Sequence, residues 1–314
     1  MSENQRRLGK TGLYVSEVGL GCNNFGVRMD ELATERVVHA ALDQGITLFD
    51  TADVYGEQRS EVYLGKALQG RRDQAIVATK FGSPVGPGNL NRGGSRRYVR
   101  AAIEASLARL NTDYIDLYQI HFPDAATPVD ETLGVLDDLV REGKVRYIGH
   151  SNFTGWQIAD ADWQAKSSGV QRFVTAQNHL SLLERDALKE VIPACDRFSI
   201  GLLPYFPLAS GMLTGKYHRG EAPEQGTRMA QVERIARRSL TDANFDLVDR
   251  LTAYAQSQGR SLLDLAFGWL LSFPSVSSVI AGATSPAQIE ANLNAASWRL
   301  SEEQMAEVKS VVNG

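Results

Sequence analysis

Short apolar runs alternate along the chain with longer amphipathic segments rich in Ala, Leu and charged residues. This alternation is typical of successive βα units, and continuous apolar runs indicate strands that are buried on both faces. Between the runs, apolar positions recur at helical spacing, for example in residues 101–110 and 133–140. The runs predicted as strands are residues 15–20, 46–50, 75–80, 114–121, 145–149, 173–177, 199–204 and 277–281.

Eight βα units are the number that a closed barrel requires, and no linker rich in Pro, Gly or Ser divides the chain. The sequence therefore predicts an α/β fold, the (β/α)8 TIM barrel, with residues 1–314 in one domain rather than a two-domain doubly wound sheet. A turn that contains Gly9 and Gly12 predicts an N-terminal β-hairpin closing one end of the barrel. The polar residues 211–241 predict a long insertion between strands 7 and 8, lying over the C-terminal face.

Composition narrows the class of protein. The hydrophobic fraction of 43% and the charged fraction of 22% are ordinary for a globular protein. The 33 basic and 37 acidic residues give a formal net charge of −4, so we expect no nucleic-acid partner. We also expect no membrane association and a cytoplasmic location, because the start is polar and no apolar stretch is long enough to span a bilayer.

Neither cysteine chemistry nor a metal is expected. Cys22 and Cys195 lie far apart and outside any metal-ligand spacing, and no HExxH motif is present, so we predict reduced thiols and no metal. The segment from Gly19 to Gly26 has the spacing GxGxxxxG, which does not match the dinucleotide fingerprint GxGxxG and argues against a Rossmann site. No amphipathic stretch is left over once the barrel helices are assigned, so the oligomeric state stays open.

Chemically reactive residues stand at the ends of three neighbouring predicted strands. Asp50 ends the second strand, Lys80 ends the third and His121 ends the fourth, while Tyr55 follows the second strand in the next loop. In a β/α barrel the C-terminal ends of the strands carry the active site. The four side chains are therefore predicted to converge.

This set of side chains suits the reduction of a carbonyl group, which needs a proton donor to oxygen beside the hydride donor. A Tyr with a pKa of about 10 is protonated at pH 7 and can donate. The ammonium of Lys80 is expected to lower the pKa of Tyr55, and Asp50 is expected to keep the buried Lys80 charged. His121 is expected to orient the carbonyl oxygen.

The motifs FDTADVYG, VATK and DLYQIH resemble the catalytic motifs of the aldo-keto reductase superfamily. The family's tetrad matches Asp50, Tyr55, Lys80 and His121. The resemblance extends from LGKTGLYVSEVGLG near the start to GATSPAQIEANL near the end. It implies a β/α barrel, a small carbonyl compound as substrate, and NADPH as cofactor, with NADH possible.

The resemblance also implies a cofactor site. Segments GHSNF and TAQNHLSLL match the part that holds the nicotinamide carboxamide, and LPYFPL supplies a ring that stacks on the nicotinamide. The segment PLASGMLTGK resembles the pyrophosphate loop of the longer-chain members, which include the potassium-channel β subunits. The matching residues are Asp50, Ser151, Asn152, Gln177, Tyr205, Pro207, Leu208, Ser210, Gly211, Lys216, Arg228, Gly282, Thr284, Gln288 and Asn292.

The sequence departs from the family at the adenosine end. Where short-type members bind the 2′-phosphate with a Lys-Ser pair and an Arg, this chain has Gly282-Ala283 and Gln288, and Ala291 replaces a Glu. The choice between NADPH and NADH is therefore open.

The substrate pocket and the biological role are less constrained. Phe25, Val54, Phe122 and the insertion are expected to form the walls of the substrate pocket. A nicotinamide-nucleotide-binding regulatory or sensor subunit with little turnover is the alternative function, whereas an aldolase using Lys80 as a Schiff-base amine leaves Tyr55 unexplained.

Overall fold

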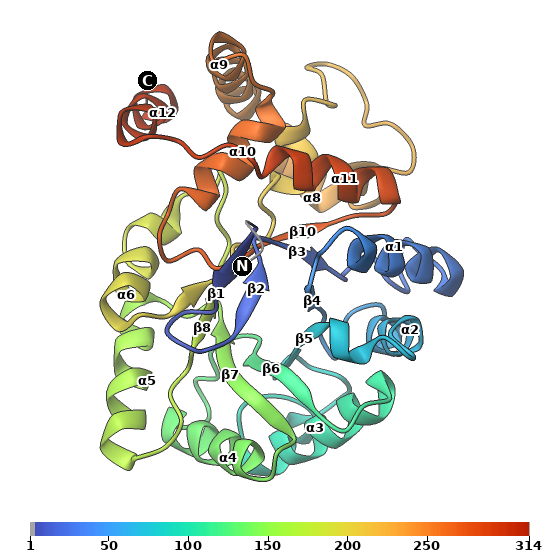
Figure 1. Ribbon diagram of the computed structural model, residues 1–314, viewed down its shortest axis with the longest axis vertical. Helices are drawn as coiled ribbons and strands as arrows, with labels where there is room; N and C mark the ends of the chain where they lie inside the picture. Colours follow the sequence, from blue (N-terminus) through green and yellow to red (C-terminus); the bar gives the residue numbers. More distant parts are fainter. Residues whose placement is uncertain (1–3, 314) are drawn as a thin grey trace.

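Eight parallel strands form the centre of the computed structural model, which describes residues 4–313. They occur in the order β10, β3, β4, β5, β6, β7, β8, β9, and parallel bridges from Leu202 to Val276 and from Tyr205 to Ile280 close the ring. The predicted (β/α)8 barrel is confirmed (Figure 1). The strands are β3 (Val18–Gly21), β4 (Leu48–Asp50), β5 (Ile76–Phe81), β6 (Ile115–Ile120), β7 (Val145–Ser151), β8 (Thr175–Gln177), β9 (Gly201–Leu202) and β10 (Val279–Gly282).

Helices surround the barrel and bury their apolar faces against the strands in one large core (Figure 1). Their starts follow local sequence: Asp30, Ser95 and Ser285, for example, accept a hydrogen bond from a backbone N–H in the first turn. The helices of this layer are α1 (Glu31–Asp43), α2 (Arg59–Ala67), α3 (Arg96–Leu110), α4 (Val129–Arg141), α5 (Gly155–Ser168), α6 (Val191–Phe198), α10 (Leu262–Leu271) and α11 (Pro286–Ala295).

Additional elements extend this layer. Helices α9 (Asp242–Ser257) and α12 (Glu302–Asn313) pack against each other outside α10 (Figure 1). The single-turn elements are η1 (Arg72–Gln74), η2 (Asn89–Asn91) and η3 (Asp186–Leu188). No helix in the described part of the chain is long and apolar enough to cross a membrane.

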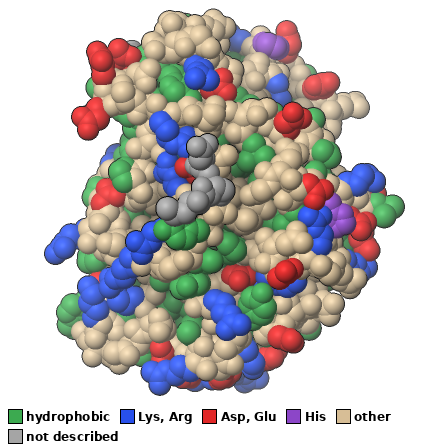
Figure 2. Space-filling model, viewed as in Figure 1, with side chains coloured by type: hydrophobic (Ala, Val, Ile, Leu, Met, Phe, Trp, Pro, Cys, Tyr) green, Lys and Arg blue, Asp and Glu red, His purple; other side chains and the backbone are tan. Residues whose placement is uncertain are grey.

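The predicted hairpin closes the N-terminal end of the barrel. Its strands β1 (Gln5–Arg7) and β2 (Tyr14–Ser16) lie across the front of the ring in Figure 1. Leu8 and Val15 from this hairpin form an apolar plug with inward residues of the barrel strands, including Leu48 and Ala78. Gly9 has a φ of +55° and lies so close to the Val174 carbonyl that a Cβ would clash, so the turn requires glycine. Figure 2 shows that both basic and acidic side chains surround this closed face.

Two strand predictions need correction. Residues 15–20 do not form one strand, because the chain turns at Glu17 from the hairpin into the barrel, leaving Val15 in β2 and Val18 at the start of β3. Residues 199–204 contain only the short β9. The reason is that Ser199 ends α6 in a left-handed conformation, with a φ of 57°.

The insertion between β9 and β10 consists of η4 (Ala209–Thr214), α7 (Arg228–Gln231) and α8 (Glu233–Ser239), and is followed by α9 and α10. It reaches the loop between β3 and α1, where Arg28 donates a hydrogen bond to the Gly226 carbonyl. The insertion therefore covers the C-terminal ends of the strands, as the sequence predicts.

Candidate active site

A cavity of about 770 Å³ opens at the C-terminal ends of the barrel strands. Its size is typical of small-molecule and cofactor sites. The structure brings every residue predicted for the cofactor site to its wall, together with Tyr55 and His121. Lys80 is fully buried behind the wall, between Asp50 and Tyr55. Of the residues predicted for the walls of the substrate pocket, Val54 and Phe122 line the cavity. Phe25 is buried in the core instead, so its predicted place in the pocket wall is wrong.

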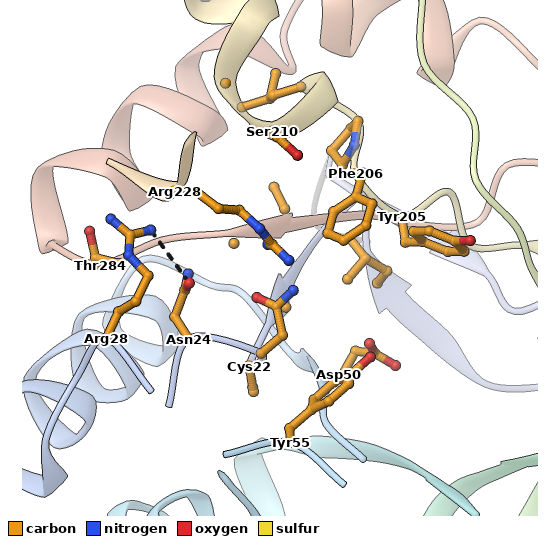
Figure 3. Close-up of a pocket in the computed structure, with 18 of the residues that line it drawn as sticks. Cys22, Asn24, Arg28, Asp50, Tyr55, Tyr205, Phe206, Ser210, Arg228 and Thr284 are labelled. Carbon is orange, nitrogen blue, oxygen red and sulfur yellow. Dashed lines mark hydrogen bonds between the residues drawn. The ribbon is translucent and has the colours of Figure 1, made fainter. Parts of the chain in front are cut away.

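Strand alternation explains why the charged side chains meet inside the barrel. Leu48 and Ala78 point into the apolar plug, and the residues two positions later, Asp50 and Lys80, therefore point into the barrel as well, nearer its C-terminal end. Lys80 Nζ lies 2.7 Å from Asp50 Oδ2, 2.8 Å from the Thr51 carbonyl oxygen and 3.3 Å from the Tyr55 hydroxyl. Figure 3 shows Asp50 and Tyr55 side by side at one end of the cavity.

Burial and charge compete at this cluster. Burial opposes the charge on Lys80, but Asp50 and Tyr55 outweigh it and raise the pKa of Lys80 above its usual value. The pKa of Tyr55 is also raised, because the cost of burying a phenolate exceeds the favourable effect of Lys80. The expectation of a lowered Tyr55 pKa is thus wrong: Lys80 acts in the expected direction, but desolvation is larger.

His121 faces Tyr55 across the mouth of this cluster. Their ring centroids are 5.7 Å apart in an edge-on arrangement, and His121 Nδ1 lies 3.2 Å from the Ser83 hydroxyl. Burial, assisted by the charge on Lys80, lowers the pKa of His121 to about 3. The imidazole is therefore neutral at physiological pH. Phe122 stacks on it, with ring centroids 4.9 Å apart, and is 52% exposed.

A network of amide and hydroxyl groups forms the adjoining wall. Gln177 Nε2 donates to Asp50 Oδ1 at 2.8 Å, and the Ser151 hydroxyl donates to the Gln177 carbonyl. Asn152 has a φ of 63°. Its side-chain nitrogen Nδ2 donates to both the His121 backbone carbonyl and the Ser151 hydroxyl. The Tyr205 hydroxyl donates to Asn152 Oδ1 at 2.8 Å, which fixes the orientation of the Tyr205 ring.

The rest of the cavity wall includes three basic side chains. Arg28, Lys216 and Arg228 line it, and within residues 4–313 none of them forms an ion pair with a carboxylate. Arg228 is packed over the Phe206 ring, and burial together with the charge of Arg28 lowers its pKa. Figure 3 shows Arg228 between the Tyr55 end and the Arg28 end of the cavity. Three cations without counterions in one cavity are suited to binding an anionic ligand.

A buried acidic pair lies behind the cavity and has no part in the sequence predictions. Asp53 follows β4, and its carboxylate accepts a hydrogen bond from the Tyr98 hydroxyl at 3.2 Å, while its second oxygen has no partner in the described chain. Glu61 is paired with Arg109 and accepts from the Thr79 hydroxyl. Burial and the neighbouring Glu61 raise the pKa of Asp53 to about 7.

Sequence reasoning missed the polar residues of the loop between β3 and α1. Asn23, Asn24 and Arg28 line the cavity, whereas the one residue of this loop that was predicted for the pocket, Phe25, lies in the core. The GxGxxxxG spacing of residues 19–26 argues against a Rossmann site, but it says nothing against a role of this loop in a barrel cavity. The signal that could have identified it is its position directly after the first barrel strand, where barrel active sites are built.

Comparison with known proteins agrees with this architecture. The aldo/keto reductase family model matches residues 17–313. An uncharacterized oxidoreductase, YrpG of Bacillus subtilis (strain 168), is 36% identical, covering 98% of this chain and 95% of that protein. Aldo-keto reductase YhdN of the same organism is 35% identical, covering 96% and 91%. A probable voltage-gated potassium channel subunit beta of Arabidopsis thaliana is 34% identical, covering 92% and 90%.

The predicted resemblance, including its branch, is confirmed over nearly the whole chain, and the relatives' names indicate an oxidoreductase. The family model extends from the start of the barrel to α12, so it covers the strand ends that carry Asp50, Tyr55, Lys80 and His121. This protein belongs to the aldo/keto reductase family.

Proposed function

We propose that this protein reduces an aldehyde or ketone to an alcohol, with NADPH as the hydride donor and Tyr55 as the proton donor. The observation that carries the proposal is the position of the Tyr55 hydroxyl. It lies 3.3 Å from the buried Lys80 ammonium, at one end of a cavity whose other parts carry three cations that have no ion-pair partner among residues 4–313.

The cavity wall fits a nicotinamide dinucleotide. The amide and hydroxyl groups of Ser151, Asn152 and Gln177 would hold the carboxamide, and the fixed ring of Tyr205 would stack on the nicotinamide. Lys216 and Arg228, with the backbone of η4, would hold the pyrophosphate. The segment from Gly282 to Asn292 would hold the adenosine. When bound, the reduced cofactor supplies the hydride that the carbonyl carbon accepts.

The proton for the substrate oxygen comes from the protein's own side chains in this proposal. Because burial raises the pKa of Tyr55, its hydroxyl carries a proton at neutral pH and can transfer it to the oxygen as negative charge develops there. The phenolate that remains is stabilised by Lys80 at 3.3 Å, and Asp50 at 2.7 Å holds that ammonium in its charged form. Asp50 thus has a supporting role, and Tyr55 is the acid.

His121 and the apolar walls would position the substrate. A neutral imidazole can donate one hydrogen bond to a carbonyl oxygen without competing with Tyr55 for the proton, since its pKa of about 3 keeps it uncharged. Phe122 and Val54 supply apolar contact beside it. This combination supports a small or aromatic carbonyl compound as the substrate class.

The Tyr55→Phe variant tests the proposal. Reductase activity is followed by the loss of absorbance of NADPH with a panel of aldehydes, and cofactor binding is followed by quenching of tryptophan fluorescence. The expected loss in turnover is roughly 10²- to 10⁴-fold, as for other general acids, with cofactor binding retained. Tyr14→Phe is the matched control, because Tyr14 lies in the hairpin at the opposite end of the barrel.

Undiminished turnover by Tyr55→Phe would remove Tyr55 from its role. Tight cofactor binding by the wild-type protein, without turnover of any aldehyde in the panel, would instead favour the regulatory or sensor function.

A further inference from the structure

Arg28 lines the cavity and forms no ion pair with a carboxylate in the part of the chain that the structure describes. Its Nη1 lies 3.5 Å from Asn24 Oδ1 and its Nη2 donates to the Gly226 carbonyl, but both partners are neutral. Its Nε is buried without any hydrogen-bond partner in the described chain. Burying the N–H of a charged group without a hydrogen-bond acceptor costs free energy. The unpaired Nε of Arg28 therefore indicates that a ligand supplies the missing acceptor.

The position of Arg28 identifies the part of the ligand it would meet. A Cβ built on Gly282 would lie 3.2 Å from Asn24 Nδ2, so the Arg28–Asn24 pair stands beside the end of β10. In Figure 3, Arg28 and Thr284 lie together at the end of the cavity opposite Asp50 and Tyr55. Arg28 is therefore at the end proposed for the adenosine.

The segment proposed to hold the adenosine supplies no cation of its own. Its cavity-lining residues are neutral, and the Gln288 side-chain oxygen is already engaged by the backbone N–H of Thr284 at 2.7 Å. The residues of this segment that line the cavity are Gly282, Thr284, Gln288, Ala291 and Asn292. A phosphate attached to the adenosine ribose would thus need a cation from another element.

Charge balance gives the same indication. A dinucleotide diphosphate brings two negative charges, which Lys216 and Arg228 can match, and Arg28 is then left as a surplus cation. Burial is the main reason for the lowered pKa of Arg228, and the positive charge of Arg28 adds to it, so the two cations repel each other. An additional phosphate near Arg28 would relieve this repulsion.

We propose that Arg28 binds the 2′-phosphate of NADPH and thereby makes the protein select NADPH over NADH. The inference rests on the proposed function, since it assumes that the cavity holds a nicotinamide dinucleotide. It assigns the selection to the loop between β3 and α1 rather than to the segment after β10. The contact to Gly226 would additionally hold the insertion over the bound nucleotide.

The test compares Arg28→Gln with wild type in the full-length protein. Dissociation constants for NADPH and NADH are measured by quenching of tryptophan fluorescence, and those for adenosine 2′,5′-bisphosphate and adenosine 5′-monophosphate by calorimetry. Losing a hydrogen bond to a charged group lowers affinity roughly 10- to 100-fold, so we expect the NADPH preference to fall by that factor. The preference for the bisphosphate over the monophosphate should fall in parallel.

Two further variants separate charge from folding. Arg28→Lys keeps the charge and should restore most of the preference, whereas Arg36→Gln, on the exposed face of α1, should leave it unchanged. Equal weakening of NADPH and NADH by Arg28→Gln would show that Arg28 only holds Gly226, and an unchanged ratio would show no role in selection. Either result overturns the inference while leaving the reductase intact. A wild-type protein that binds neither dinucleotide would instead overturn the proposed function.

Discussion

Asp53 should make the stability of this protein depend on pH, in a direction opposite to that of most carboxylates. Its pKa is about 7 in the folded protein because of burial and the proximity of Glu61, against about 4 in an unfolded chain. The folded state therefore binds the proton more tightly than the unfolded state does. Stability is lost as pH rises from about 4 to 7, and the full cost is present above pH 7.

The magnitude follows from the size of this shift. Each pKa unit corresponds to about 1.4 kcal/mol, so the roughly three-unit shift costs up to about 4 kcal/mol, of which about 3 kcal/mol develops between pH 5 and pH 8. Asn is nearly isosteric with the protonated carboxyl and can still accept the hydrogen bond from Tyr98. Asp53→Asn should therefore be far more stabilising at pH 8 than at pH 5.

The assay is urea unfolding of wild type and Asp53→Asn at pH 5, 6, 7 and 8, followed by circular dichroism. Comparing the two proteins at each pH cancels the contributions of all other titrating groups. Asp113→Asn is the matched control, because Asp113 is exposed on the barrel surface. A stability difference between Asp53→Asn and wild type that stays constant from pH 5 to pH 8 would refute the reasoning, as would a carboxyl carbon resonance of Asp53 that titrates near pH 4.

Two further predictions concern the active site. Lys80→Met should lower the free energy of unfolding by roughly 3–5 kcal/mol, because it leaves the buried Asp50 carboxylate without its cation. Urea unfolding midpoints measure this loss. Adding Asp50→Asn should recover part of it, because the unpaired charge is then removed. For His121, whose pKa is about 3, kcat/KM should show no step near pH 6.5 between pH 5 and 7.5, and a step there that disappears in His121→Gln would contradict a neutral imidazole.

The fold and the convergence of the four reactive residues were accessible from the sequence because both depend on local patterns. Strand alternation places Asp50 two positions after the inward Leu48 and Lys80 two positions after the inward Ala78. Adjacent parallel strands then bring these positions together, as the 2.7 Å separation of the two charged groups shows.

Quantities that depend on three-dimensional distances could not be predicted in the same way. The direction of the Tyr55 pKa shift depends on how far burial outweighs the effect of Lys80 at 3.3 Å. A sequence gives neither the degree of burial nor this distance. Phe25 follows a barrel strand as Asn24 does, yet Phe25 turns into the core and Asn24 into the cavity. Irregular loop backbone has no fixed period from which to read the direction of a side chain.

Asp50 couples the two halves of the candidate site. One carboxylate oxygen accepts from Lys80 at 2.7 Å and the other from Gln177 at 2.8 Å, so the same group holds the cation beside Tyr55 and the amide wall proposed for the nicotinamide. The amide wall continues through Ser151 and Asn152 to the hydroxyl of Tyr205. These hydrogen bonds connect the Lys80–Asp50 pair, which lies beside the proposed proton donor Tyr55, to the wall proposed for the nicotinamide. In the proposed reaction, this network would hold the hydride donor and the proton donor in place for the carbonyl compound.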